Sequence, residues 1–170
     1  YHQHKTSNMP LATKIELLSS QDIYLDIKAS SIVFFISDFL NQILKNENKN
    51  LDIFNEINEL IKQLDQKNYQ SHLIFLLALL KIQGISPLID KKAYLDPEAG
   101  TFSENYSNQF FNETISLLWK SILTSPDPYS IKIPSKERKD LLDSILNYYK
   151  YHIPNFKTPI SLEIVQQIFE

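Results

Sequence analysis

The feature that most constrains this fold is an unbroken run of eight apolar residues from Leu73 to Leu80. A helical repeat would spread these side chains over every face, so the run predicts a helix surrounded by other elements. Gly84 can end it as a left-handed cap, and we expect the central core helix to span residues 70–83. The run is far shorter than the roughly 20 apolar residues that cross a membrane, so we expect no membrane partner.

Further helical patterns surround this segment. Asp26 can cap a largely buried helix that runs to about residue 46, and an apolar stripe over 51–66 predicts a surface helix. Ser135 is expected to cap a helix over 135–152, and Pro159 to open the last helix. Turn residues at 96–100 predict a β-hairpin between the segments 93–95 and 101–102, and another helix is expected over 112–123.

The expected fold class is therefore mainly α, a helical bundle body with a small β-hairpin and a short N-terminal extended or strand segment. Residues 1–25 show short alternating segments, which favour strands or extended chain. The expected domains are 1–25, the end of an incomplete N-terminal β domain or a strap, and 26–170, a helical domain. The chain begins with Tyr1 and not with Met, which suggests a piece of a longer polypeptide.

The composition excludes several kinds of chemistry. The chain has no cysteine, which removes disulfides, thiolate metal sites and cysteine nucleophiles. Its two glycines, Gly84 and Gly100, cannot form a Gly-rich phosphate loop. His2 and His4 could share one face of a strand, but no third metal ligand lies nearby in sequence. We therefore expect no metal, no cofactor and no enzymatic activity.

The basic residues gather towards the end of the chain. Residues 132–157 carry six basic and three acidic side chains, whereas the whole chain has 17 basic and 20 acidic residues. The helix expected over 135–152 places lysines on one polar stripe with tyrosines at its margins. Such a stripe can bind single-stranded DNA by phosphate contact and base stacking, and the candidate residues are Lys136, Lys139, Tyr148, Lys150 and Tyr151. The alternative is ordinary packing of tyrosine rings at a helix edge.

Three blocks of sequence resemble one known family. They run from Phe75 to Asp90, from Tyr94 to Phe102 and from Tyr148 to Glu163. In this order they resemble the core helix with its G-x-x-P turn, the hairpin and the closing helices of RecO, a bacterial recombination mediator, in the style of the Bacteroidetes branch. The resemblance implies a non-catalytic, cytoplasmic and nucleoid-associated protein of DNA repair and recombination. Its implied partners are RecR, single-stranded DNA and the C-terminal tail of the single-stranded DNA-binding protein (SSB), and its implied role is strand annealing and recombinase loading.

The chain also departs from the family pattern. RecO proteins that bind zinc carry cysteine pairs around the hairpin, and this chain has Asp90-Lys91-Lys92 there, so zinc is not expected. Residues 1–17 resemble only the last strands of the family's OB-fold, so DNA binding by this chain should be weak.

The resemblance also implies a site for the SSB tail, an acidic peptide with an apolar end. Such a peptide needs a cation for its terminal carboxylate and an apolar slot for its last side chain. The candidate docking residues are His72, Phe156 and Lys157. The alternative function is a helical protein–protein adaptor domain with no nucleic-acid role.

Overall fold

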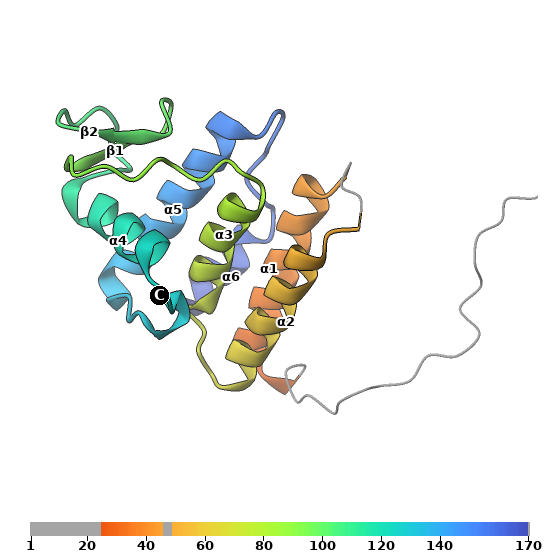
Figure 1. Cartoon of the computed structure of the whole chain (residues 1–170). Helices are drawn as coiled ribbons and strands as arrows, with labels where there is room; N and C mark the ends of the chain where they lie inside the picture. The colour runs from red at the N-terminus through yellow and green to blue at the C-terminus, as the bar shows by residue number, and fades with distance from the viewer. Residues whose placement is uncertain (1–24, 46–48, 170) are drawn as a thin grey trace, which may run out of the picture.

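The structure, a computed structural model, describes residues 25–45 and 49–169 (Figure 1). Within these ranges the chain forms six α-helices, a short 3-10 helix and a two-stranded antiparallel sheet. In chain order the elements are α1 (Ile27–Ile43), α2 (Leu51–Asp65), α3 (Ser71–Ile82), β1 (Tyr94–Asp96), β2 (Thr101–Ser103), α4 (Glu113–Thr124), η2 (Pro128–Ser130), α5 (Ser135–His152) and α6 (Leu162–Phe169). The predicted mainly helical fold with a small hairpin is confirmed. Within the same ranges, no helix is long and apolar enough to cross a bilayer.

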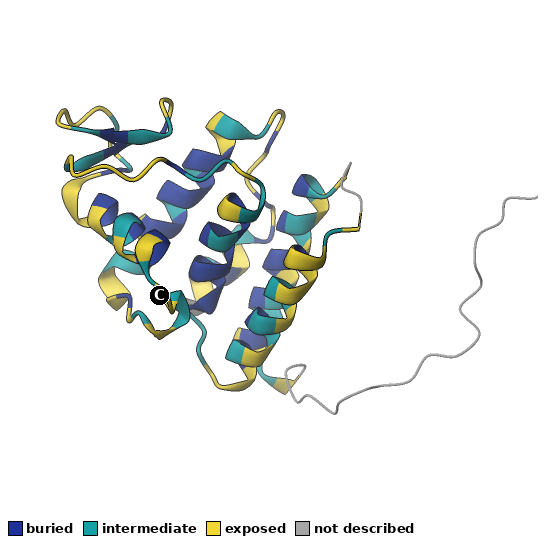
Figure 2. Ribbon diagram, viewed as in Figure 1, coloured by how far each residue is buried: buried dark blue, intermediate teal, exposed yellow. Residues whose placement is uncertain are grey.

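Helix α3 lies at the centre of the core, as its sequence predicts. It has α1 and α2 on one side and α4 and α5 on the other (Figure 1). Every residue from Ser71 to Leu80 is buried except Ala78, which is half-buried (Figure 2). At its end, Gly84 adopts a φ of +71°, and Ile85 N donates to Leu80 O at 3.0 Å. This bond closes the left-handed cap that ends the helix.

The two preceding helices begin at side-chain caps. The Asp26 carboxylate accepts hydrogen bonds from the backbone at the start of α1, and Asn50 does the same for α2. The outer position of α2 is confirmed, since its exposed face looks away from α3 (Figure 2). The predicted apolar stripe is partly wrong, because Leu51 and Phe54 are exposed while Ile53 is buried. Helix α1 is also less buried than predicted, since Phe34 remains 58% exposed.

The hairpin packs against α4 and the C-terminal end of α5. Leu95 lies opposite Phe102 in the antiparallel register, and both side chains are buried. Leu95 N donates to the Ser116 hydroxyl on α4 at 3.0 Å. His152 Nε2 donates to Pro97 O at 2.8 Å, which ties the hairpin loop to α5.

Two predicted helix starts are corrected. Ser135 is the first residue of α5 and not its cap, because Pro134 occupies the cap position without a side-chain hydrogen bond. The last helix begins at Leu162 and not at Pro159, since a turn closed by Leu162 N and Pro159 O at 3.2 Å precedes it. The extended segment and the domain boundary predicted over residues 1–25 lie almost entirely outside the described residues.

Candidate functional site

A small pocket lies where the starts of α3 and α5 meet α6. We call it the α3–α5–α6 pocket, and its volume is about 60 Å³. Four kinds of side chain line it, namely cations, aromatic rings, aliphatic groups and uncharged polar groups: Tyr69, Gln70, His72, Ser135, Arg138, Lys139, Leu142, Val165 and Gln166. This mixture of a basic rim and an apolar wall is the chemistry that an acidic peptide with an apolar end requires.

His72 forms part of the buried wall. Its Nδ1 donates to Tyr69 O at 2.6 Å, and its ring meets the edge of Phe35 with centroids 6.4 Å apart. Burial of the imidazole, reinforced by the nearby Arg138 guanidinium, lowers the pKa of His72 to about 4. His72 is therefore neutral at pH 7, so it shapes the pocket and does not supply its positive charge.

Arg138 supplies a fixed positive charge at the rim. Its Nε donates to Ile133 O at 3.1 Å, and its Nη2 donates to Gln70 Oε1 at 3.5 Å. Guanidinium has five N–H donors, so most of them remain for a carboxylate. Lys139 follows on the same helix and lines the same pocket, so two cations stand at one opening.

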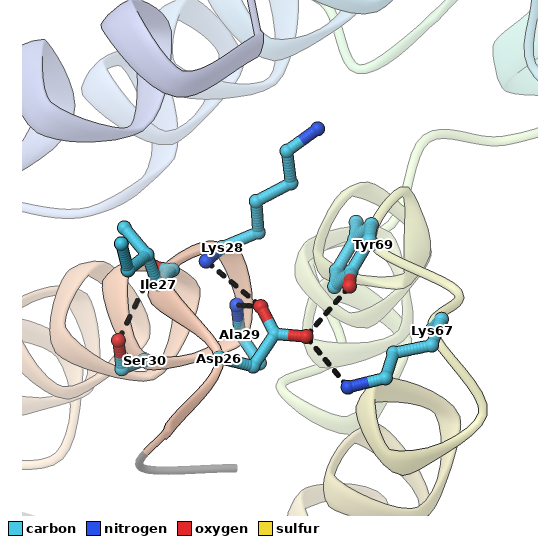
Figure 3. A network of polar contacts seen from close by, with 7 residues as sticks. All are labelled: Asp26, Ile27, Lys28, Ala29, Ser30, Lys67 and Tyr69. Carbon is cyan, nitrogen blue, oxygen red and sulfur yellow. Dashed lines mark hydrogen bonds and ion pairs between the residues drawn. The ribbon is translucent and has the colours of Figure 1, made fainter.

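The Tyr69 side of the pocket is held in place by α1. Tyr69 Oη donates to Asp26 Oδ2 at 2.6 Å, and Lys67 Nζ lies 2.7 Å from the same oxygen (Figure 3). The other carboxylate oxygen, Oδ1, accepts from the backbone of α1 and caps that helix (Figure 3). One carboxylate thus joins the start of α1 to the loop that opens α3.

The structure separates the predicted docking residues. His72 lies in the α3–α5–α6 pocket, whereas Phe156 and Lys157 line a different hollow beside Asp38 and Gln42. The two hollows share no lining residue. Phe156 is buried, and its ring packs on Phe39 and Tyr149 with centroids 5.4 and 5.5 Å apart. Its ring therefore belongs to the core.

The predicted DNA-binding residues are also divided. Lys136, Lys139, Lys150 and Tyr151 are exposed on α5. Tyr148 is 1% exposed, its ring packs on Trp119, and its hydroxyl donates to Ile85 O at 3.0 Å. It cannot stack on a base, so its place among the DNA-binding candidates is corrected to the packing alternative.

An acidic residue interrupts the remaining lysines. Asp143 lies between Lys139 and Lys150 along α5, and both cations act on its carboxyl group. Burial is the larger influence and raises the pKa of Asp143. Lys136 Nζ also lies 3.3 Å from Glu137 Oε1, so the stripe is a surface of mixed charge.

Among the lining residues of the pocket, sequence reasoning assigned only His72 to docking, and those it missed include Arg138 and Tyr69. Arg138 and Tyr69 are far apart in the chain, and only the packing of α5 beside α3 brings them together. One signal was available, since Arg138 is the single arginine among 17 basic residues and arginine favours bidentate carboxylate binding.

The described part of the chain shows no group of three or more metal-ligating His, Asp or Glu side chains. The paired His2 and His4 lie outside the described residues.

Comparisons with known proteins match most of the chain. A sequence model of the family described as "Recombination protein O C terminal" matches residues 24–159. A protein of Flavobacterium psychrophilum named "DNA repair protein RecO" is 31% identical over an alignment of 153 residues that covers 86% of this chain and 64% of that protein. The protein of the same name from Christiangramia forsetii is 30% identical, over 82% of this chain and 61% of its own length.

A more distant match extends over the whole chain. The "DNA repair protein RecO" of Porphyromonas gingivalis strain W83 is 22% identical, over 100% of this chain and 74% of that protein. The chain thus spans a little under two thirds of the Flavobacterium relative's length. No solved structure matches it.

Proposed function

This chain belongs to the RecO family, and we propose that it acts as a non-catalytic binding region of a DNA repair and recombination protein. The family match and the relatives named for DNA repair support this role. The chemistry of the pocket supports a specific partner class, because a basic rim beside an apolar wall fits an acidic peptide with an apolar end.

We propose that the α3–α5–α6 pocket binds the C-terminal tail of SSB. The observation that carries this proposal is that Arg138 and Lys139 line the same pocket as the apolar side chains of Leu142 and Val165. The guanidinium would bind the terminal carboxylate of the tail, and the apolar side chains would hold its last residue. The neutral ring of His72 would complete the slot.

The exposed face of α5 is the proposed contact for single-stranded DNA. Lys136, Lys139 and Lys150 would contact phosphates, and Tyr151, 49% exposed, could stack on a base. Asp143 opposes this charge, so binding by this chain should be weak and should fall steeply with salt. Binding that does not change with salt would argue against the lysine contacts.

In the full-length protein, this region would work together with RecR and an OB-fold. The proposed outcome is recruitment to SSB-coated strands, followed by annealing and recombinase loading without covalent chemistry. The adaptor alternative differs in one result, because it predicts no binding of single-stranded DNA at any salt concentration.

A peptide titration tests the docking proposal. Fluorescence anisotropy would follow a labelled acidic peptide that ends in an apolar residue with a free carboxylate. We expect Arg138→Ala to weaken binding by about tenfold or more, since it removes a charge-assisted contact. Lys157→Ala, in the other hollow, is the matched control and should leave the affinity unchanged. The opposite pattern would move the site to the hollow at Lys157, and absence of binding by the unmodified chain would refute the proposal.

A further inference from the structure

Gln70 occupies the position before the first residue of α3, where short polar side chains usually cap a helix. Glutamine is not among the favoured caps, and the Gln70 side chain makes no capping hydrogen bond. Departures from local preference of this kind often mark a residue with another task.

The amide of Gln70 is committed to the chain segment before α5. Its Nε2 donates to Ile131 O at 2.6 Å, and its Oε1 accepts from Ile133 N at 3.0 Å. These two bonds fix which end of the amide is oxygen, because a carbonyl can only accept and a backbone N–H can only donate. The same oxygen, Oε1, also accepts from Arg138 Nη2 at 3.5 Å.

Two carbonyl oxygens therefore hold the guanidinium of Arg138 along one side. Ile133 O binds Nε and Gln70 Oε1 binds Nη2, and Gln70 itself holds the Ile133 peptide. Arg138 and Gln70 both line the α3–α5–α6 pocket. A planar guanidinium fixed at Nε and at one N–H of Nη2 leaves the end-on pair of N–H groups, one from Nη1 and one from Nη2, for a carboxylate.

We propose that Gln70 is a positioning residue that aims the Arg138 guanidinium at a carboxylate entering the pocket. The inference rests on the proposed function and deepens it, because it names the group that sets the preference for a free C-terminal carboxylate. In this role Gln70 acts through Arg138 and not through a contact of its own with the peptide. It acts by restricting rotation of the one arginine in the chain.

Nuclear magnetic resonance tests the orientation without any peptide. Arginine-specific ¹⁵N labelling of the 170-residue chain gives a single set of guanidinium signals, since Arg138 is its only arginine. We expect separate Nη signals in the unmodified chain and merged Nη signals in Gln70→Met, which keeps the length of the side chain and removes its polar atoms. The Nε–H signal, bonded to Ile133 O, reports in the same spectrum whether the Ile133 peptide, which Gln70 also holds, stays in place. Unchanged Nη signals in Gln70→Met would overturn the positioning role, whatever the peptide does.

Peptide selectivity tests the consequence. We compare the affinity for the acidic peptide with a free C-terminal carboxylate and for the same peptide with a C-terminal amide. The unmodified chain should prefer the carboxylate by about tenfold, and Gln70→Met should reduce this preference to about twofold. Affinity for the amidated peptide should stay within about twofold of its original value.

The outcomes separate the two proposals. A merely structural role for Gln70 would weaken both peptides equally, and that result would overturn the inference. Arg138→Lys, which keeps the charge and loses the planar fork, should reduce the preference as Gln70→Met does. If the unmodified chain binds neither peptide, the proposed function fails, and the guanidinium signals still decide whether Gln70 orients Arg138.

Discussion

Replacement of Asp26 should destabilise the fold more than loss of a helix cap alone. Asp26 Oδ1 accepts from Lys28 N at 2.9 Å and from Ala29 N at 3.1 Å, which caps α1. Asp26 Oδ2 accepts from Lys67 Nζ at 2.7 Å and from Tyr69 Oη at 2.6 Å (Figure 3). The Asp26→Ala change removes the cap and both links to the loop before α3.

The size of the effect follows from these contacts. Loss of the cap costs about 1 kcal/mol of the free energy of unfolding. With the further hydrogen bonds to the carboxylate, the expected loss of unfolding free energy in Asp26→Ala is about 2 kcal/mol. The Lys67 contact adds little to this figure, because the Lys67 side chain is 61% exposed and water screens the ion pair. Asp26→Asn keeps a capping oxygen and loses the charge, so about 1 kcal/mol is expected.

Asn50 offers a matched control on the next helix. Its Oδ1 accepts from Asp52 N and Ile53 N at 3.0 and 3.2 Å, which is the same capping geometry. Within residues 25–45 and 49–169, no side-chain hydrogen bond links Asn50 to another element. Urea unfolding at pH 7 should therefore give a cost of about 1 kcal/mol for Asn50→Ala, half that of Asp26→Ala. Equal costs for the two variants would refute the claim that Asp26 ties α1 to α3.

The same carboxylate predicts a dependence on pH. Hydrogen bonds from Lys67 and Tyr69, in that order of influence, hold the pKa of Asp26 well below its usual range. A carboxyl group whose pKa is lowered by folding stabilises the fold above its unfolded pKa of about 4 and loses this contribution as the pH falls further. The difference in stability between Asp26→Asn and the unmodified chain should therefore shrink below pH 4. A constant difference down to pH 2 would contradict this assignment.

Three further predictions concern the core and the pocket. Burial lowers the pKa of His72 to about 4 in the folded chain, so the unfolded chain is protonated first as the pH falls, and the free energy of unfolding should drop by about 2 kcal/mol between pH 7 and pH 5. Urea unfolding of His72→Gln should show a weaker dependence on pH, and an equal dependence would count against a buried neutral imidazole. Gly100→Ala should lower the free energy of unfolding by about 1 to 2 kcal/mol, because the φ of Gly100 is +62° and the new Cβ would lie 3.3 Å from Tyr148 Oη. Thermal unfolding measures this loss, and an unchanged Tm would contradict the turn geometry. Tyr149→Phe should lower the free energy of unfolding by about 1 to 2 kcal/mol, since the buried Tyr149 hydroxyl donates to an α3 carbonyl at 2.8 Å. Tyr151→Phe, on the exposed face of α5, should leave the free energy of unfolding unchanged. Equal losses in the two variants would refute the difference between a buried and an exposed hydroxyl.

The central part of the fold could be predicted because its signals are local. The apolar run from Leu73 to Leu80 requires burial on every side, and Gly84 ends the helix by its own backbone preference. Asp26, the predicted cap, lies within two or three residues of the N–H groups that it caps. Such features depend on neighbours in sequence, so one chain is enough to read them.

The helix starts at Ser135 and Pro159 were wrong by local capping, whereas the errors in the buried faces arose where tertiary packing decides. A helical stripe fits Leu51 and Phe54 as well as Ile53, and only the angle at which α2 meets α3 selects the buried set. Tyr148 and Tyr151 are three residues apart on α5, yet one faces Trp119 in the core and the other faces solvent.

The candidate site could be predicted only in part for the same reason. His72 was assigned to docking from its place at the start of the core helix, and the structure brings it beside Arg138. The partner cation comes from α5, which lies more than sixty residues further along the chain. No spacing rule connects residues that far apart, so the resemblance supplied Lys157, and not Arg138, as a candidate cation.

The central claim is that an acidic peptide with an apolar end binds in the α3–α5–α6 pocket. The most direct test is a heteronuclear NMR titration of the ¹⁵N-labelled chain with that peptide, read residue by residue. The account predicts that the largest shifts occur at His72, Arg138, Lys139 and Leu142, with little change at Lys157. Shifts centred on Lys157, or no shifts at all, would contradict it.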